Sequence, residues 1–296
     1  MDTVQAEAIL INAIEKTRPR WEQYNESWSN IDTVFIVRGY EQQGFQMFKM
    51  ADLLEERGVL SIERLGVILC RIPHAGAYDR QFAGSLSSEL YSRLRNGACG
   101  QEGSRFEDAI REFLGRKIGS PGRTMWKLLY QMLQACSHLR TRYSSSFANY
   151  VLCKYAHHVG RGHVSDNDFL SLTPSAWQSF LKVMRPWNEL AGIGPNAFDF
   201  IFGDITEAVF ARDSFKFDSA NRHFLQVAGI SALIQPFDRE ETIRFLKSLA
   251  LPYTLREINK GMYTYCSITE GHNYGFFRNP ARCVLCDVRD ICAKNF

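Results

Sequence analysis

The chain has 296 residues, 45% of them apolar, and a formal net charge of +3. That apolar content is ample for a packed core, and a charge this small permits a polyanionic partner without requiring one. The N-terminus lacks the features of a secretory signal, and no apolar run approaches 18 residues, which argues against export and against a membrane span. We therefore expect a soluble cytoplasmic protein, associated with the nucleoid if it is prokaryotic.

Apolar residues recur at helical spacing along most of the chain. The segments with this spacing are 3–15, 45–56, 105–118, 124–137, 145–156 and 240–250. Two short runs, 32–37 and 65–72, fit either strands or buried helical turns. The sequence predicts a mainly α protein, and the glycine-rich stretch 95–104 is the best candidate for a domain boundary.

The stretch WNELAGIGPNAFDFIFGDI predicts two helices joined by a tight turn. Gly192 and Gly194 can adopt positive φ and allow close approach of another backbone, and Pro195 suits the first turn of the second helix. The amides at the start of that helix would point outward, where a phosphate oxygen could bind. Leu190 and Ile193 would anchor the turn in the core. An ordinary helix–turn–helix corner is the alternative interpretation.

Half of the eight cysteines lie in the last 31 residues, at positions 266, 283, 286 and 292. In a reducing compartment, clustered thiols are typical of metal ligands rather than disulfides. Thiolates suit both iron–sulfur clusters and zinc. A zinc ribbon usually carries two CxxC pairs and this chain has one, so the pattern favours a [4Fe–4S] cluster over zinc. Unligated structural cysteines are the third possibility.

Three motifs in order resemble the helix-hairpin-helix, endonuclease III superfamily of DNA glycosylases. They are LAGIGPNAF, then Asp218 followed by Ser219 in FKFDSANRHFL, then the x2 and x5 spacings of Cys283, Cys286 and Cys292. Iron–sulfur members of that family end in C-x6-C-x2-C-x5-C. Here sixteen residues separate Cys266 from Cys283, so the first ligand departs from the family pattern.

The resemblance implies an endonuclease III-like fold and a DNA partner. It predicts a helical barrel over 105–230 that carries the hairpin, and a cluster-bearing segment over 231–296. Residues 1–104 match nothing in the family, and part of them would pack with the cluster domain. The expected partner is double-stranded DNA with a flipped base, bound by a monomer through the hairpin residues Gly192, Ile193, Gly194 and Asn196.

The resemblance also predicts which residues carry the chemistry. Family members that nick the strand carry a lysine where this chain has Asn196, so we expect a glycosylase without lyase activity. Asp218 would stabilise the positive charge that develops on the sugar, as in glycoside hydrolysis. The alternative role for Asp218, an N-cap of the helix over 219–228, is compatible with that function.

In the adenine-specific branch of the family, a glutamate on an early barrel helix protonates the departing base. Glu112 in RFEDAIREFLGRKIG falls at its position, and a buried Glu112 with a raised pKa could act as the general acid. Glu107 and Asp108 compete for this role, and an exposed helical glutamate is the simpler reading. Lys117 falls where the family fills the gap left by the flipped nucleotide, or it contacts a phosphate.

The sequence does not identify the base that would be excised. Mismatched, alkylated and modified bases all remain open, in repair or in defence against base-modified DNA. Two rival functions also remain open. One is a non-catalytic DNA-binding protein that keeps the hairpin and the cluster, and the other is a glycosylase with lyase activity from a different amine.

Overall fold

The computed structural model describes residues 1–40, 45–70, 100–115, 123–267 and 274–296. This part of the chain is mainly helical and contains no strand, which confirms the expected class. Both ambiguous runs are helical in the described residues, since 32–37 lies within α2 and 65–70 within α4. The chain forms two compact units, which are described one at a time.

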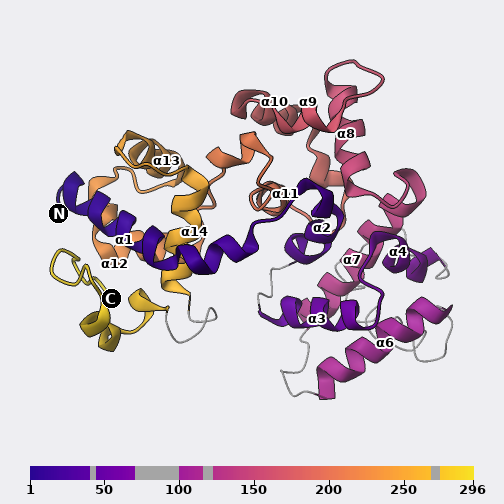
Figure 1. Cartoon of the computed structure of the whole chain (residues 1–296), viewed down its shortest axis with the longest axis horizontal. Coiled ribbons are helices and arrows are strands. Elements are labelled where there is room, and N and C mark those ends of the chain that lie inside the picture. Colours follow the sequence, from indigo (N-terminus) through magenta and orange to yellow (C-terminus); the bar gives the residue numbers. More distant parts are fainter. Residues whose placement is uncertain (41–44, 71–99, 116–122, 268–273) are drawn as a thin grey trace. The chain divides into compact units, whose positions relative to one another are not determined.

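Unit 1 combines both ends of the chain, Met1–Asn25 and Ala208–Phe296. Its helices are α1 (Thr3–Trp21), α12 (Ser219–Ala228), α13 (Arg239–Ser248) and α14 (Leu255–Cys266), with short 3-10 turns η1 (Glu22–Tyr24), η5 (Val209–Asp213), η6 (Ile230–Leu233), η7 (Phe276–Arg278) and η8 (Pro280–Leu285). α1 packs along α14, and α14 packs on α12 (Figure 1). The first helix of the chain is therefore part of the same core as its last residues.

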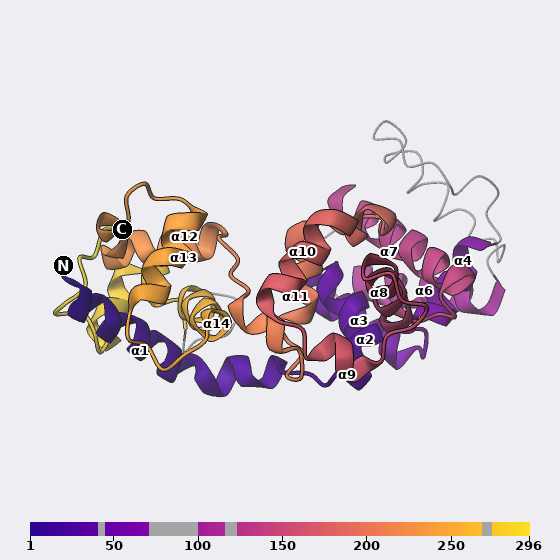
Figure 2. The same cartoon turned by 90° about the horizontal axis from the view of Figure 1, so that it is seen from above.

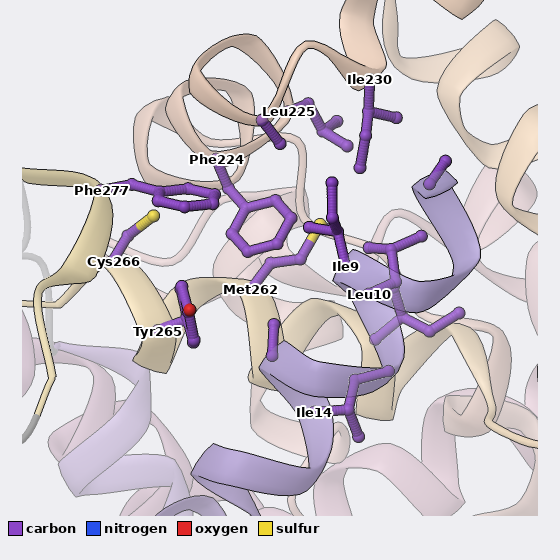
Figure 3. Close-up of a cluster of buried hydrophobic side chains, with 14 of the residues drawn as sticks. Ile9, Leu10, Ile14, Phe224, Leu225, Ile230, Met262, Tyr265, Cys266 and Phe277 are labelled. Carbon is purple, nitrogen blue, oxygen red and sulfur yellow. The ribbon is translucent and has the colours of Figure 1, made fainter. Parts of the chain in front are cut away.

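The core of unit 1 is built where these three helices meet (Figure 3). Ile14 of α1 packs closely against Gly261 of α14. A Cβ added to Gly261 would lie 2.7 Å from Ile14 Cγ1. Phe224 of α12, with Met262 and Tyr265 of α14, fills the space between the helices and is fully buried. Because the contact at Gly261 is backbone-close, a larger side chain there would force α1 and α14 apart.

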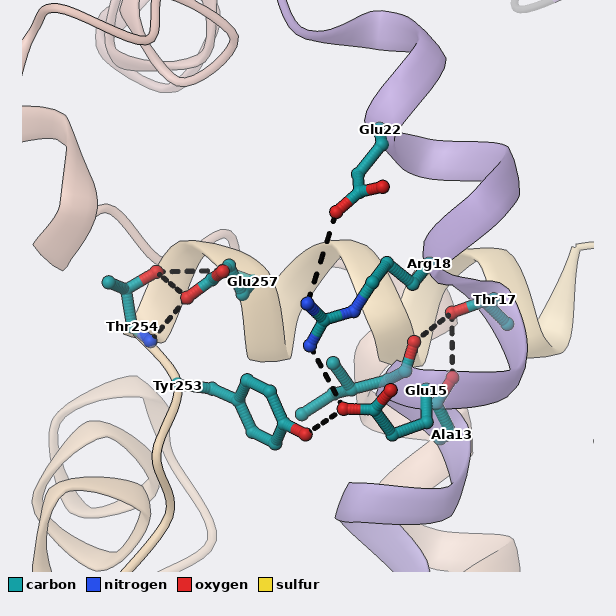
Figure 4. A network of polar contacts seen from close by, with 9 residues as sticks. Ala13, Glu15, Thr17, Arg18, Glu22, Tyr253, Thr254 and Glu257 are labelled. Atoms are coloured by element: carbon teal, nitrogen blue, oxygen red, sulfur yellow. Dashed lines mark hydrogen bonds and ion pairs between the residues drawn. The ribbon is translucent and has the colours of Figure 1, made fainter.

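A polar network fastens the outer side of α1 to the start of α14 (Figure 4). Arg18 contacts Glu15 at 2.9 Å and Glu22 at 4.0 Å, and Glu15 accepts a hydrogen bond from Tyr253. Thr254 begins α14 with a capping box, in which its own backbone N–H donates to Glu257. Hydrogen bonds therefore fix the residues just before α14 as well as the helix itself.

Unit 2 spans Glu26–Glu207. Its helices are α2 (Ile31–Gly39), α3 (Phe45–Glu56), α4 (Ile62–Cys70), α6 (Gly100–Gly115), α7 (Arg123–Arg142), α8 (Phe147–His158), α9 (Asp166–Leu170), α10 (Pro174–Met184) and α11 (Pro195–Phe202), with η2 (Trp28–Asn30) and η4 (Pro186–Glu189). α4 packs on α7, α3 on α6, and α2 on α11, and α4 and α7 lie side by side in both views (Figures 1 and 2).

The core of unit 2 is rich in aromatic rings. Phe35 of α2 stacks on Phe147 of α8 with ring centroids 4.5 Å apart, and Trp177 of α10 meets Phe202 of α11 at 4.9 Å. All four rings are buried. Such pairs add specific geometry to the hydrophobic burial, so the helices around α11 have little freedom to shift.

The two ends of unit 2 are hydrogen bonded to each other. Glu26 and Ile205 form a parallel bridge, in which Glu26 N donates to Asp204 O and Thr206 N donates to Glu26 O. The Glu207 carboxylate accepts from the backbone N–H of Trp28 at 3.1 Å. The chain therefore enters and leaves this unit at one place.

These units divide the chain at positions other than those expected from the sequence. Position 104 lies within α6 in unit 2, because α3 and α4 from the N-terminal region pack on α6 and α7. Position 230 lies within unit 1, at the start of η6. Only residues 1–25 of the N-terminal region join the cysteine-bearing end of the chain.

Candidate functional site

The backbone of the hairpin follows the pattern expected from its sequence. η4 ends at Glu189, the carbonyl of its C-cap Leu190 accepts from the Ile193 N–H at 3.0 Å, and α11 begins with Pro195. Gly192 has φ +81°, which a side chain would rarely allow. Gly194 has φ −107°, so only the first glycine needs positive φ. The expectation of unusual backbone at both glycines is thus corrected at the second one.

Packing against α2 and α7 holds the hairpin in place. The side chain of Ile193 is buried against Gly39 at the end of α2. A Cβ added to Gly39 would lie 2.8 Å from Ile193 Cδ1. Tyr40 donates a hydrogen bond to the Ala191 carbonyl at 2.8 Å. A Cβ on Gly192 would lie 2.8 Å from Gln131 Oε1 of α7. The turn is therefore anchored by packing on the side that faces the core, as expected for Ile193.

The start of α11 remains open on its outer side. Gly194 is the N-cap and supplies no side chain to it, and no heavy atom lies within 4 Å of where its Cβ would be. Asn196 is exposed in the first turn. Backbone N–H groups and the positive end of the helix dipole make such a helix start suitable for a phosphate oxygen.

Asp218 lies in unit 1 and is the N-cap of α12. Its Oδ1 accepts from the Asn221 N–H at 2.9 Å, and its side chain is 22% exposed. The second oxygen, Oδ2, lies 3.9 Å from Lys216 Nζ. The residue therefore caps the helix with one oxygen, and the carboxylate is still partly accessible to solvent.

Two buried asparagines hold the backbone just before Asp218 by hydrogen bonds. Asn221 Nδ2 and Asn259 Nδ2 both donate to the Lys216 carbonyl, at 2.8 and 3.0 Å. Asn221 is fully buried and Asn259 is 4% exposed. Lys216 is not among the residues predicted from the sequence, although an amine two residues before the candidate carboxylate is a signal that the sequence offers.

Glu112 of α6, in unit 2, is not buried as the general-acid hypothesis required. Its side chain is 28% exposed, and Oε2 lies 2.6 Å from Arg57 Nη2. The buried acidic residue of this helix is Glu107, which pairs with Arg111 at 2.5 Å. Glu112 lies beside Arg57 because α3, which that arginine follows, packs on α6. Lys117 lies outside the described residues.

Cys266 lies at the end of α14, inside the core of unit 1 (Figure 3). It is 1% exposed beside Phe277, and burial raises the pKa of its thiol to about 12. Cys286 is 6% exposed, and its sulfur lies 3.0 Å from the hydroxyl of Tyr265. These two thiols therefore have protein surroundings of different polarity.

Cys283 and Cys292 are partly exposed, and Cys292 Sγ donates to the Val227 carbonyl at 3.6 Å. Within the described residues, no three His, Cys, Asp or Glu side chains are grouped so that they could hold a metal ion. Four thiols have the right donor chemistry for an iron–sulfur cluster. Burial, and then the neighbouring thiols of Cys286 and Cys283, raise the pKa of the Cys292 thiol, so these three cysteines lie near one another. The four-cysteine cluster therefore stays a prediction.

Comparison with protein families, curated proteins and solved structures finds no match to this chain. None of the described helices is both long and apolar enough to cross a membrane. Function must therefore be argued from the residues and their geometry.

Proposed function

We propose that the protein binds double-stranded DNA through the hairpin and hydrolyses the N-glycosidic bond of a flipped base, leaving an abasic site. The observation that carries this proposal is the hairpin itself. Gly192 makes the turn, Ile193 anchors it, and α11 presents an uncapped start to its outer side. A helix start of this kind suits a phosphate group of the DNA backbone.

The candidate chemistry belongs to Asp218. Loss of a base builds positive charge on the sugar, and a carboxylate beside it stabilises that charge. The capping bond to the Asn221 N–H holds the carboxyl group in one orientation. Asn196 offers no amine for attack on the sugar, so water is the proposed nucleophile and the strand stays intact.

Glu112 is the proposed proton donor to the departing base. In this role it would have to exchange its partner, because Arg57 now holds its carboxylate at 2.6 Å. A carboxylate beside a guanidinium prefers the ionised form, which opposes proton donation. We therefore expect Glu112 to contribute less to the reaction than Asp218.

A specific observation favours a second candidate, a DNA-binding protein without excision. Both candidate carboxylates already have structural partners, since Asp218 caps α12 and Glu112 pairs with Arg57. These contacts would stabilise the fold without any catalysis. Such a protein would bind DNA through the hairpin and release no base.

A [4Fe–4S] cluster bound by the C-terminal cysteines stays a prediction from their spacing, and Cys266, whose burial raises its thiol pKa to about 12, is the least suited of the four expected ligands. No step of the proposed reaction depends on it. Such a cluster would hold the end of the chain against unit 1 and would give the purified protein a yellow-brown colour.

Base release is the decisive measurement. Duplexes that carry a panel of mismatched, alkylated and modified bases are incubated with the protein, and free bases are identified by mass spectrometry. Asp218→Asn should slow release by roughly two to three orders of magnitude, as loss of one such electrostatic contact costs about 3–4 kcal/mol of barrier. Glu112→Gln should slow release less.

Asp213→Asn is the matched control, because Asp213 is another acidic residue of unit 1 and pairs with Lys247 at 2.7 Å. It should leave release unchanged. DNA binding with no base released from any duplex would favour the non-catalytic candidate. Full activity of Asp218→Asn would show that another carboxylate does this work.

Binding through the hairpin has its own test. Asn196→Asp places a negative charge at the start of α11, where it suits the helix dipole but repels a phosphate. DNA affinity should fall several-fold while stability is kept. Ser175→Asp is the control, since Ser175 also follows the first-turn proline of a helix, Pro174 of α10. Equal effects of the two changes would rule out the hairpin as the phosphate site.

A further inference from the structure

Lys216 carries the only positive charge placed beside Asp218 in the ion pairs of the described residues. Its Nζ lies 3.9 Å from Asp218 Oδ2. The lysine side chain is 42% exposed and that of Asp218 is 22% exposed, so both groups are open to a ligand. An amine and the candidate catalytic carboxylate therefore share one accessible surface of unit 1.

The backbone of this lysine is held by hydrogen bonds, and its side chain is 42% exposed. The Lys216 carbonyl accepts from Asn221 at 2.8 Å and from Asn259 at 3.0 Å, and both asparagines are buried. Arg256, also buried, lies 3.4 Å from Asn259 Oδ1 and supports it from within α14. The backbone at Lys216 is thereby fixed, while the four-carbon side chain beyond it can still change partner.

The contact between Lys216 and Asp218 is weak enough to be exchanged. At 3.9 Å it is longer than a direct charge-assisted hydrogen bond. Exposed pairs of this kind add little stability and are screened by salt. A phosphate diester would compete well for the ammonium, because neutralising a phosphate also releases counterions from the DNA.

We propose that Lys216 binds the DNA phosphate next to the target nucleotide and leaves Asp218 as it does so. This inference rests on the proposed function. In the free protein the ammonium neutralises part of the charge of the carboxylate. When DNA is bound, the phosphate takes the ammonium, and the negative charge of Asp218 then faces the developing sugar cation alone. Lys216 is thus a binding residue coupled to the catalytic one.

The salt dependence of DNA binding tests this assignment. The affinity of the whole protein for a duplex is measured at several salt concentrations, for the wild type and for Lys216→Gln. Each phosphate contact adds about 1 to the slope of log affinity against log salt, so Lys216→Gln should lower the slope by about 1. Lys216→Arg keeps the charge and should keep most of the slope.

Lys247→Gln is the matched control. Lys247 is in the same unit, is 49% exposed and pairs with Asp213, but belongs to α13. Its removal should leave the slope unchanged, and circular dichroism checks that each variant is folded. A slope unchanged in Lys216→Gln, or lowered equally in Lys247→Gln, overturns the proposal.

Kinetics separate the lysine from the carboxylate. Lys216→Gln should raise KM several-fold with a smaller effect on kcat, whereas Asp218→Asn should lower kcat with KM nearly unchanged. Borohydride trapping of a covalent DNA adduct on Lys216, located by peptide mapping, would make the lysine a nucleophile and overturn the phosphate role.

The two proposals fail in different ways. If the wild type releases a base but the salt slope of Lys216→Gln is unchanged, the proposed function stands and the phosphate role is wrong. If the wild type does not bind DNA at all, both are wrong. If DNA binds with the predicted change in slope but no base is released, only the excision proposal fails.

Discussion

The hairpin and the cysteine segment, residues 276–296, are both anchored in a core but differ in how much apolar surface they leave exposed. In unit 2 the buried side chain of Ile193 fits against Gly39, and a Cβ added to Gly192 would lie 2.8 Å from Gln131 Oε1. In unit 1 the cysteine segment leaves Val284 and Leu285 72% and 65% exposed. The first is seated by packing on its neighbours, and the second presents apolar side chains to solvent.

Polar contacts attach much of the cysteine segment. Asp287 Oδ2 lies 2.6 Å from Lys16 Nζ of α1. Cys286 lies 3.0 Å from the Tyr265 hydroxyl, and the Ala293 N–H donates to the Ala228 carbonyl at the end of α12. Close packing and buried contacts such as Cys286–Tyr265 give one well-defined arrangement, whereas exposed polar contacts such as Lys16–Asp287 permit several. The hairpin should therefore keep its shape without a ligand, and the cysteine segment should depend on what its thiols bind.

The largest effect is expected from a substitution that disturbs the packing of the hairpin. Gly192→Ala should lower the free energy of unfolding by about 2–4 kcal/mol, because positive φ disfavours a side chain and the new Cβ would meet Gln131. Gly194→Ala should cost less than about 1 kcal/mol, since its φ is ordinary and the space around it is open. Urea unfolding measures both. Similar costs at the two glycines would contradict the described turn.

The second prediction separates a cysteine that packs in the core, Cys266, from one that is expected to bind metal, Cys286. Cys266→Ala should cost about 1–2 kcal/mol of stability through lost core packing. If the protein binds iron, that variant should keep it, whereas Cys286→Ala should lose it. Iron analysis and absorption near 400 nm, where iron–sulfur clusters absorb, report metal content, and thermal unfolding reports stability. Loss of iron in Cys266→Ala would instead place this thiol among the ligands.

The third prediction concerns the ion pair that attaches the cysteine segment. Lys16→Gln should cost less than about 1 kcal/mol, because both partners are partly exposed and salt screens them. The difference from the wild type should shrink as salt is added. Lys260→Gln, on α14, is the control, since Lys260 contacts the neutral side chain of Asn25 and lies over the ring of Trp21. A cost that does not respond to salt would point to packing by the lysine stem.

The smallest expected effect is a pH response near the hairpin. His138 of α7 lies 3.5 Å from Glu189 of η4, and burial lowers the pKa of the imidazole below 6.5, although Glu189 opposes the shift. The unfolded chain then binds the proton more readily, so this group adds stability above pH 6.5 that is lost as pH falls through and below that value. The wild type should lose more stability than His138→Gln between pH 7.5 and 5.5. Parallel losses in urea unfolding would exclude this group.

The parts of the molecule that could be predicted from sequence are those with local causes. Pro195 can start a helix and Gly192 can turn the chain wherever they occur, so the hairpin is visible in a few consecutive residues. The same holds for Asp218, which both interpretations place at the start of α12. A capping residue acts on amides two or three positions away, and this reach is short enough to read from a sequence.

Other features depend on residues that meet only after folding. Arg57 lies 55 positions before Glu112, and no local sequence pattern predicts that they form an ion pair. Cys266 is buried because α14 lies in a core that α1 and α12 complete from distant parts of the chain. Spacing alone treats this thiol as equal to Cys286, although their surroundings differ. Side-chain partners across such distances follow from tertiary packing, which periodicity does not encode.

The bridge between Glu26 and Ile205 makes unit 2 an insertion whose ends adjoin. Such an insertion adds little loop-closure entropy to the folding of unit 1. When unit 2 is folded, its adjoining ends act as a short connection between residues 25 and 208 of unit 1. A polypeptide of residues 26–207 should therefore be expressible as an independent domain, and new termini could be opened elsewhere in it by circular permutation. Evolution could likewise exchange or lengthen this unit without interrupting the pairing of α1 with α14.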